Sequence, residues 1–317
     1  MLPFVPHPLP IPVDSPFPVS NIPFGIFSTL KKPQPRPGVA VGEHVLDLCA
    51  LAAQGHIQGS EQMRRALCQP TLNDFAALPG HERAAVRRSI QELITTRGSP
   101  LYDEQGQSKY LVQSADVNLH LPMTIGGFTD FSCSLVHMRN AGRIAGHPQL
   151  PANFFNVPPA YNGRASSVVV SGTPIHRPYG IRPDSHDDHI AFGLSQKLDY
   201  EVELGMFVSN SIPLGQRISA SKAKDHIFGF VLLNDWTARD IQFYEMTPLG
   251  PFNGKAFATS ISPWIVTLEA LQEAGAIIPV DKDGLQDELQ GGKASTIPFL
   301  QAKEDVSAEV LTFLDSM

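Results

Sequence analysis

The sequence is poor in cysteine, in long apolar runs and in clustered positive charge, and each shortage excludes a class of protein. The three cysteines among 317 residues, Cys49, Cys68 and Cys133, are odd in number and are not spaced like metal ligands. We therefore expect reduced thiols in an intracellular, cytoplasmic protein. No apolar run approaches the ~18 residues of a membrane-spanning helix, and the N-terminus lacks the basic segment of a secretory signal.

Charge and composition bound the partners and the size of the core. There are 24 Lys and Arg against 31 Asp and Glu, which gives a net charge of -7. Because no basic cluster runs along the chain, we expect neither nucleic acid nor a membrane as the partner. A hydrophobic content of 42% suffices for a sizeable core in one large domain or two smaller ones.

The first part of the chain predicts a small β module followed by helices. Residues 1–23 are rich in proline, which prevents regular helix and predicts an extended arm against the body. Short strands with tight turns follow, and then helices and a polar connector. The expected strands are 24–28, 39–42 and 44–48, the expected helices are 60–68, a capped one from 71 and 80–96, and the connector is 98–116.

From residue 118 the composition changes to glycines, aromatics and short apolar runs, which predicts a mainly β second domain. The fold class is therefore mainly β, within the α+β class. The expected strands are 167–170, 201–208 and 227–233, with short helices at 268–274 and 308–314. We expect an N-terminal domain at 1–116, a second domain at 117–279 and a charged tail at 280–317.

The stretch 199–208 alternates with the strand period of two. Asp199, Glu201 and Glu203 are on one expected face, and Tyr200 and Val202 begin the other. Adjacent carboxylates repel each other, so such a face is either exposed to solvent or directed at a hard cation.

Two further acids could complete such a cation site. Asp235 ends the apolar run 227–233, and Asp130 lies in a glycine-rich segment. Each could instead cap a helix or a turn. With Glu201 and Glu203 they make a carboxylate set that suits Mg²⁺ or Ca²⁺ and does not suit zinc.

Two more residue types near these acids can carry chemistry. His137 follows Asp130 closely and is either structural or a proton acceptor. Lys255 stands among small residues at 254–260 and is either a surface charge or a ligand contact, since the glycine spacing of a P-loop is absent.

At this point the residues resemble a known family, the fumarylacetoacetases. The similar blocks cover about 17–279 and are long enough to be specific. They are Thr129-Asp130-Phe131, Gly163-Arg164-Ala165-Ser166-Ser167, Asp199-Tyr200-Glu201-Val202-Glu203, residues 234–242, residues 248–255 and Ser262-Pro263-Trp264. The resemblance implies an SH3-like barrel module before a β-roll catalytic domain. It also implies a cytoplasmic homodimer that acts in tyrosine and phenylalanine catabolism.

The resemblance further implies hydrolysis of a carbon–carbon bond in a 1,3-diketo acid, as in fumarylacetoacetate. His137 matches the base that activates water, while Gln242 and Lys255 match groups that stabilise the oxyanion. Tyr161 matches a substrate-binding residue. The implied metal residues are Asp130, Glu201, Glu203 and Asp235, with Lys255 and Thr259 around them.

The sequence departs from the family on the substrate side. Ser132 and Met246 stand where the family has tyrosines that touch substrate, and Gly146 stands where an arginine is expected. Arg143 or Arg139 could substitute for that arginine. Asn162 replaces a histidine and Ala258 a glycine. We therefore expect a different diketo substrate, bulkier or less acidic.

A second departure concerns the last forty residues, which are not expected to resemble the family. There the family has further strands, a second Gly-Thr segment and a glutamate that orients the base, for which Glu304 and Glu309 are the candidates. Without these parts the chain would be a metal-binding remnant with impaired catalysis. A further alternative is a decarboxylase or isomerase of oxo acids with the same metal site.

Overall fold

The computed structural model describes residues 9, 11–144, 146, 149–151, 154, 159–183 and 189–277. The predicted tail helix at 308–314 and the candidates Glu304 and Glu309 lie outside the described residues. The N-terminal module, residues 24–120, holds short strands and helices in alternation. Its strands are β1 (Phe24–Ser28), β2 (Arg36–Val41), β3 (His44–Asp47), β4 (Leu111–Gln113) and β5 (Asn118–His120), and its helices are α1 (Leu48–Ala53), α2 (Glu61–Ala66), α3 (Asn73–Ala76), α4 (Gly80–Thr95) and α5 (Glu104–Tyr110).

The second half of the described chain is dominated by strands, as the composition predicts. The strands are β6 (Thr129–Phe131), β7 (Ala160–Asn162), β8 (Val168–Val170), β9 (Tyr179–Pro183), β10 (Ile190–Leu194), β11 (Leu198–Asp199), β12 (Val202–Val208), β13 (Ile227–Asp235), β14 (Thr237–Ala238), β15 (Thr259–Ile261) and β16 (Trp264–Thr267). The helices are α6 (Leu135–Ile144), α7 (Arg239–Glu245), α8 (Asn253–Ala256) and α9 (Leu268–Glu273).

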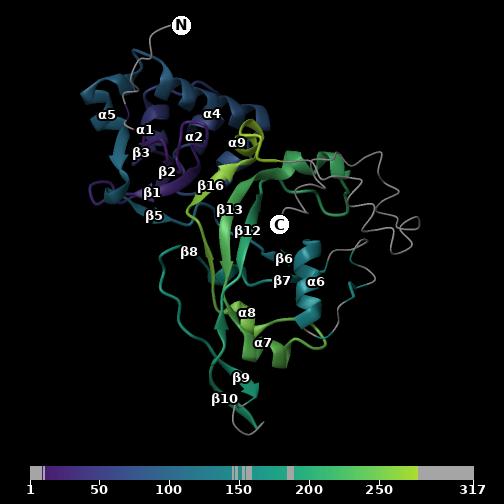
Figure 1. Ribbon diagram of the computed structural model, residues 1–317. Helices are drawn as coiled ribbons and strands as arrows, with labels where there is room; N and C mark the ends of the chain where they lie inside the picture. The colour runs from purple at the N-terminus through teal and green to yellow at the C-terminus, as the bar shows by residue number, and fades with distance from the viewer. Residues whose placement is uncertain are drawn as a thin grey trace.

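One ten-stranded sheet joins the two halves, in the order β4-β3-β2-β1-β16-β13-β15-β8, with β12 on β13 and β5 on β1. The link is the antiparallel pair β1–β16, in which Phe24 faces Ile265. In Figure 1 the helices of the N-terminal module gather around its strands, and the long strands β12 and β13 run away from them toward the β9–β10 hairpin. The predicted α+β class is confirmed, with the sheet curled into a half-barrel.

The hydrophobic core lies at the junction of the module and the sheet. Every residue of β1 and β2 is buried. The Phe75 ring stacks on Phe24 with centroids 5.1 Å apart and meets Phe228 of β13 edge-on at 5.9 Å. Leu9 and Ile22 of the proline-rich arm are buried in the same core, so the described part of the arm packs on the body as predicted.

Local predictions held best where periodicity was strong. The predicted helix 80–96 is α4, whose Val86, Ile90 and Ile94 are buried at helical spacing. The capped start at Thr71 is wrong: α3 has no side-chain cap, because the Asn73 amide pairs with the Thr124 backbone at 3.1 and 2.8 Å instead. Within the described residues, no helix combines the length and the apolar character that crossing a membrane requires.

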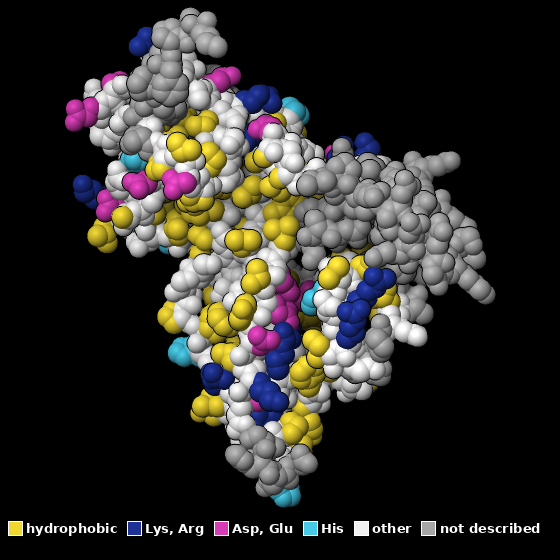
Figure 2. All heavy atoms as spheres, viewed as in Figure 1, with side chains coloured by type: hydrophobic (Ala, Val, Ile, Leu, Met, Phe, Trp, Pro, Cys, Tyr) yellow, Lys and Arg dark blue, Asp and Glu magenta, His cyan; other side chains and the backbone are white. Residues whose placement is uncertain are grey.

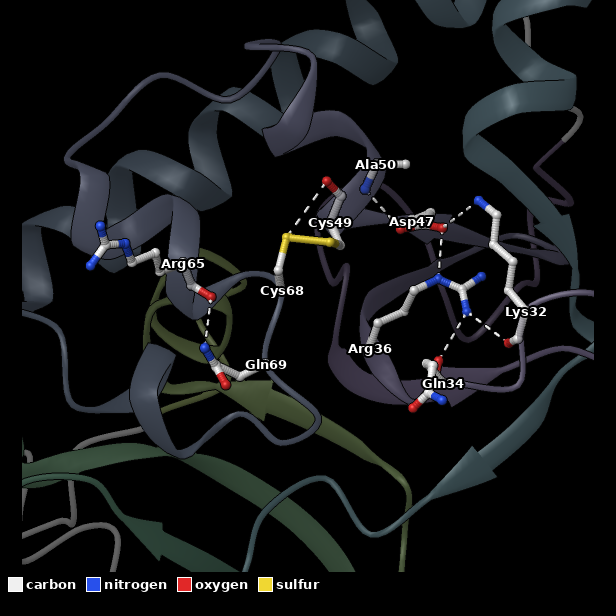
Figure 3. Close-up of a disulfide and its surroundings, with 9 residues drawn as sticks. All are labelled: Lys32, Gln34, Arg36, Asp47, Cys49, Ala50, Arg65, Cys68 and Gln69. Carbon is white, nitrogen blue, oxygen red and sulfur yellow. Dashed lines mark hydrogen bonds and ion pairs between the residues drawn. A yellow bond between two sulfur atoms is a disulfide. The ribbon is translucent and has the colours of Figure 1, made fainter.

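The prediction of three reduced thiols is wrong for two of them. Cys49 and Cys68 form a disulfide, with Cα atoms 4.7 Å apart, and Cys133 is not part of this bond. Figure 3 shows this bond beside the buried ion pair of Arg36 and Asp47, whose atoms lie 2.7 Å apart. No local pattern indicated this pairing, because the packing of α1 against α2 brings together cysteines that are 19 residues apart.

Candidate metal centre

Four carboxylates converge in the second half of the molecule. One oxygen from each lies within 4.8 Å of the others, and we call this group the acidic cluster: Asp130, Glu201, Glu203 and Asp235. In Figure 2 acidic side chains meet Lys and Arg side chains in a hollow near the middle of the visible face. Four acids at this distance are the donor set that a hard divalent cation prefers.

Strand pairing brings these acids together from distant parts of the chain. Asp130 lies in the middle of β6, where it is opposite Tyr161 of β7. Asp235 is the last residue of β13 and is fully buried. Neither carboxylate caps a helix, so the capping alternatives weighed for them do not apply: α7 begins after Ala238 without a side-chain cap.

The predicted alternation on a single strand is only partly correct. β11 ends at Asp199 and β12 begins at Val202, so Glu201 lies in a break between them. There its N–H donates to the Asn234 amide oxygen at 3.1 Å, and its carbonyl accepts from the Asp235 N–H at 3.1 Å. Asp199 therefore lies outside the acidic cluster, although its spacing placed it on the same face.

Lys255 is the cation of the cluster. It is 5% exposed, and its ammonium donates to the Glu201 carboxylate and to Asp235 Oδ2 at 2.9 Å. The predicted alternative of a surface charge is therefore wrong. Two contacts of the preceding residue, Gly254, fix the position of Lys255. Gly254 packs so closely on Gln242 that a Cβ on Gly254 would lie 2.7 Å from the backbone nitrogen of Gln242, and the Glu245 carboxylate accepts the Gly254 N–H at 2.7 Å.

Two hydroxyls complete the hydrogen bonds of Asp235. Tyr161 donates to Oδ2 at 2.9 Å, and Thr259, which is 1% exposed, donates to Oδ1 at 3.3 Å. Burial and the charges of Asp235 and Asp130 raise the pKa of Tyr161, so the phenol remains a protonated donor. Both residues named from the sequence therefore contact the acidic cluster.

The electrostatics of the cluster indicate excess negative charge. Burial, with the charges of Asp130 and Asp235, raises the pKa of Glu203 to about 9. Burial opposes the charge of Lys255, but Asp235 and Glu201 outweigh it and raise the pKa of the lysine. Four ionised carboxylates against Lys255 and Arg239 would leave a net charge of about two negative units, which one divalent cation would neutralise.

Arg239 is a contact that sequence reasoning did not assign. Its guanidinium lies 2.7 Å from Glu201 Oε1 and 2.8 Å from Asp199 Oδ2, and it donates to Gln242 Oε1 at 3.1 Å. Gln242 itself is 8% exposed. The only signal in the sequence was the repulsion among the alternating acids. It indicates that a positive side chain lies nearby but does not identify which one.

The remaining predicted site residues are not joined to the cluster. His137 lies exposed in the first turn of α6, with its N–H on Ser134 Oγ at 3.2 Å, and within the described residues no hydrogen bond or ion pair joins its ring to the acids. Arg143 is exposed in the last turn of α6. Ser132 donates its N–H to the Pro159 carbonyl at 2.8 Å, and Met246 ends α7. Their roles stay predictions.

Comparison with known proteins gives the same family for both halves of the chain. Residues 20–122 match the family model Fumarylacetoacetase N-terminal, and residues 127–293 match Fumarylacetoacetate (FAA) hydrolase C-terminal. The second match extends beyond residue 279, so the expectation that the last forty residues lack resemblance is wrong for residues 280–293.

Relatives of known name are similar over most of this chain. The fumarylacetoacetase of Rattus norvegicus is 44% identical over 270 residues, which are 83% of this chain and 64% of that protein. The fumarylacetoacetase fahA of Aspergillus fumigatus is 43% identical over 312 residues, 95% of this chain and 70% of that protein. The chain thus spans about two thirds of the length of these relatives. Among solved structures, a fumarylacetoacetate hydrolase from Exiguobacterium antarcticum is 20% identical, covering 78% of this chain and 66% of that chain with a TM-score of 0.44. On the family models and the sequence relatives, the chain belongs to the fumarylacetoacetase family.

Proposed function

We propose that this chain is a metal-dependent hydrolase that cleaves a carbon–carbon bond in a 1,3-diketo acid, either fumarylacetoacetate or a related compound. The observation that carries the proposal is the acidic cluster, whose oxygens lie within 4.8 Å of one another around Lys255. Membership of the fumarylacetoacetase family supports the reaction class.

The donor set fits Mg²⁺ or Ca²⁺. All four candidate ligands offer carboxylate oxygens, which hard cations prefer, and no Cys or His of the described residues joins the group. The raised pKa of Glu203 is consistent with this assignment: burial raises it first, and the charges of Asp130 and Asp235 add to the shift. A bound divalent cation would act as a Lewis acid toward the oxygens of a diketo acid.

The chain's own residues then have distinct tasks. His137 takes a proton from the water that attacks the carbonyl carbon, for which its exposure leaves the ring accessible. Lys255 has three N–H groups, of which Glu201 and Asp235 occupy two, so one is left for the developing oxyanion. Gln242 is a second donor for that oxygen. The bond between the carbonyl carbon and its neighbour breaks, and the departing carbon keeps the electron pair and then takes a proton.

The substrate side distinguishes this chain within the family. Ser132 and Met246 offer no phenol, so we propose a diketo acid that is bulkier or less acidic than fumarylacetoacetate. Tyr161 keeps its place at the cluster edge through Asp235. We further propose a homodimer in the cytoplasm, which size-exclusion chromatography and localisation of a tagged chain would test.

The test is turnover of fumarylacetoacetate and of a series of acylpyruvates by the purified chain with Mg²⁺, followed by loss of the diketo ultraviolet band. We expect turnover that a chelator abolishes and that falls strongly in His137→Gln. Tight Mg²⁺ binding without turnover of any substrate would overturn the hydrolase and favour the metal-binding remnant. Release of CO₂ without two acid products would favour a decarboxylase.

A further inference from the structure

Asp199 belongs to the alternating acids that pointed to the cation site, yet it has no part in the acidic cluster. Its carboxylate is half exposed, and Oδ2 accepts the Arg239 Nε–H at 2.8 Å. The backbone around it is held by other contacts: β11 pairs with β14, and the Arg239 N–H donates to the Lys197 carbonyl at 2.9 Å. The Asp199 side chain adds one backbone contact of its own, since Oδ1 accepts the Tyr200 N–H at 2.9 Å. Its other oxygen, Oδ2, is the one that holds Arg239.

The guanidinium that Asp199 holds is shared among three acceptors. Besides Nε on Asp199, Nη2 lies 2.7 Å from Glu201 Oε1 and Nη1 donates to Gln242 Oε1 at 3.1 Å. A guanidinium is planar and rigid, so fixing Nε sets the directions of both terminal nitrogens. One anchor outside the cluster thus determines how Arg239 meets Glu201 and Gln242.

The contact with Gln242 has a chemical consequence. Arginine carries only donors, so the end of the Gln242 amide that faces Arg239 is the oxygen. The NH₂ group is then the end that remains for another partner, and the buried side chain has little room to rotate. A group that stabilises an oxyanion has to donate, so this is the orientation that the reaction requires.

We propose that Asp199 is a positioning residue, which anchors Arg239 so that the guanidinium holds the Gln242 oxygen and leaves the Gln242 NH₂ directed at the substrate. The inference rests on the proposed hydrolase function for its catalytic consequence. The orientation of the Gln242 amide itself is a property of the folded chain and can be measured without substrate.

The kinetic test compares Asp199→Ala, Arg239→Ala and the double variant. We expect Asp199→Ala to lower kcat roughly tenfold with little change in KM, as is usual for a partner one contact removed from the reacting groups. The double variant should be no slower than Arg239→Ala, because Asp199 acts through Arg239. Asp199→Glu should restore part of the loss. Independent, multiplicative losses in the double variant would overturn the proposal.

Glu273→Gln is the matched control. Glu273 is also a half-exposed acid paired with a more buried arginine, Arg87, at 2.9 Å, but it lies in α9 away from the cluster. The kcat of the Glu273→Gln variant should equal that of the unchanged chain. Asp199→Asn, which keeps the size of the side chain, replaces Asp199→Ala if the alanine variant does not fold.

The second readout is independent of turnover. The side-chain NH₂ signals of Gln242 in a ¹⁵N-correlated NMR spectrum are assigned by their loss in Gln242→Glu. They should shift or broaden in Asp199→Ala and stay unchanged in Glu273→Gln. If the chain has no hydrolase activity, the proposed function fails while these spectra still decide the positioning role. Unchanged Gln242 signals in Asp199→Ala would overturn it.

Discussion

The N-terminal module and the strands that carry the acidic cluster differ in the kinds of side chain that they bury. Among the described residues, nearly all of the hydrophobic core lies before residue 124, and β1 and β2 are buried throughout. The strands around the cluster leave large apolar side chains exposed, such as Val202 at 77% and Leu232 at 69%. Beside the apolar residues that β13 buries, this half also buries polar groups at the cluster: Asp235 of β13, Thr259 of β15 and Lys255 of α8.

The contrast shows that stability and chemistry are separated along the chain. A buried apolar position contributes about 1.5–3 kcal/mol, whereas a buried charge costs free energy unless partners are supplied. The module supplies the first kind in quantity, and its buried Asp47 is paired with Arg36. The site instead brings four acids close together. This arrangement costs free energy, and it indicates a functional site because the acids can bind a cation.

The largest expected effect compares one buried acid from each half. Asp235→Asn should weaken Mg²⁺ binding by more than roughly 100-fold, since replacing a ligand should cost at least as much as replacing an outer partner. Asp47→Asn should leave Mg²⁺ affinity unchanged and cost about 3 kcal/mol of stability by leaving Arg36 without its charge partner. Calorimetric titration and urea unfolding of both variants measure the two quantities. Equal loss of Mg²⁺ affinity in both would break the comparison.

The next effect compares two positions of β13. Phe228 is 1% exposed and joins the module core through Phe75, so Phe228→Ala should lower the free energy of unfolding by about 3–5 kcal/mol. Leu232→Ala, on the exposed part of the same strand, should change it by less than about 0.5 kcal/mol. Urea midpoints give both values. A large cost at Leu232 would mean that this face is covered in solution.

The disulfide should act only on the module. Cys68→Ser removes a cross-link over 19 residues and should lower the free energy of unfolding by about 3 kcal/mol, while leaving Mg²⁺ affinity intact. Cys133→Ser, which alters the cysteine outside this disulfide, is the control for cysteine substitution. Differential scanning calorimetry with and without reductant checks the result. An unfolding temperature that is the same with and without reductant would contradict the predicted contribution of the disulfide.

The last prediction is a pH dependence that comes from the site half. The pKa of Glu203 is 4.5 in the unfolded reference and about 9 in the fold, so the folded protein holds an extra proton between these values. Its contribution to stability is full below pH 4.5 and is lost as the pH rises toward 9. With a chelator present, the unchanged chain should lose stability over this range relative to Glu203→Gln. Added Mg²⁺ should remove the difference.

The features that could be predicted from the sequence were the local ones, such as single helices, and those that the family resemblance implied. The helical spacing of Val86, Ile90 and Ile94 predicted α4 because one face of a helix needs only its own residues. The residues left the grouping of Asp130 and Asp235 with the other acids as one alternative beside caps, since no local pattern encodes strand pairing. The family resemblance favoured that grouping. The break between β11 and β12, the Arg239 contacts and the Cys49–Cys68 bond were missed, because each depends on packing between segments far apart in the chain.

The β1–β16 pair also sets a condition on how the chain is made. Phe24 cannot meet Ile265 until almost all of the described chain has left the ribosome. β5 pairs with residues 26–28 of this edge earlier. At about 5–20 residues per second, the part of β1 at Phe24 and Gly25 therefore lacks its final neighbour for roughly 10–50 s. An unpaired strand edge attracts other strands, so nascent chains should depend on chaperones, and dilution of translating ribosomes should raise the yield of soluble protein.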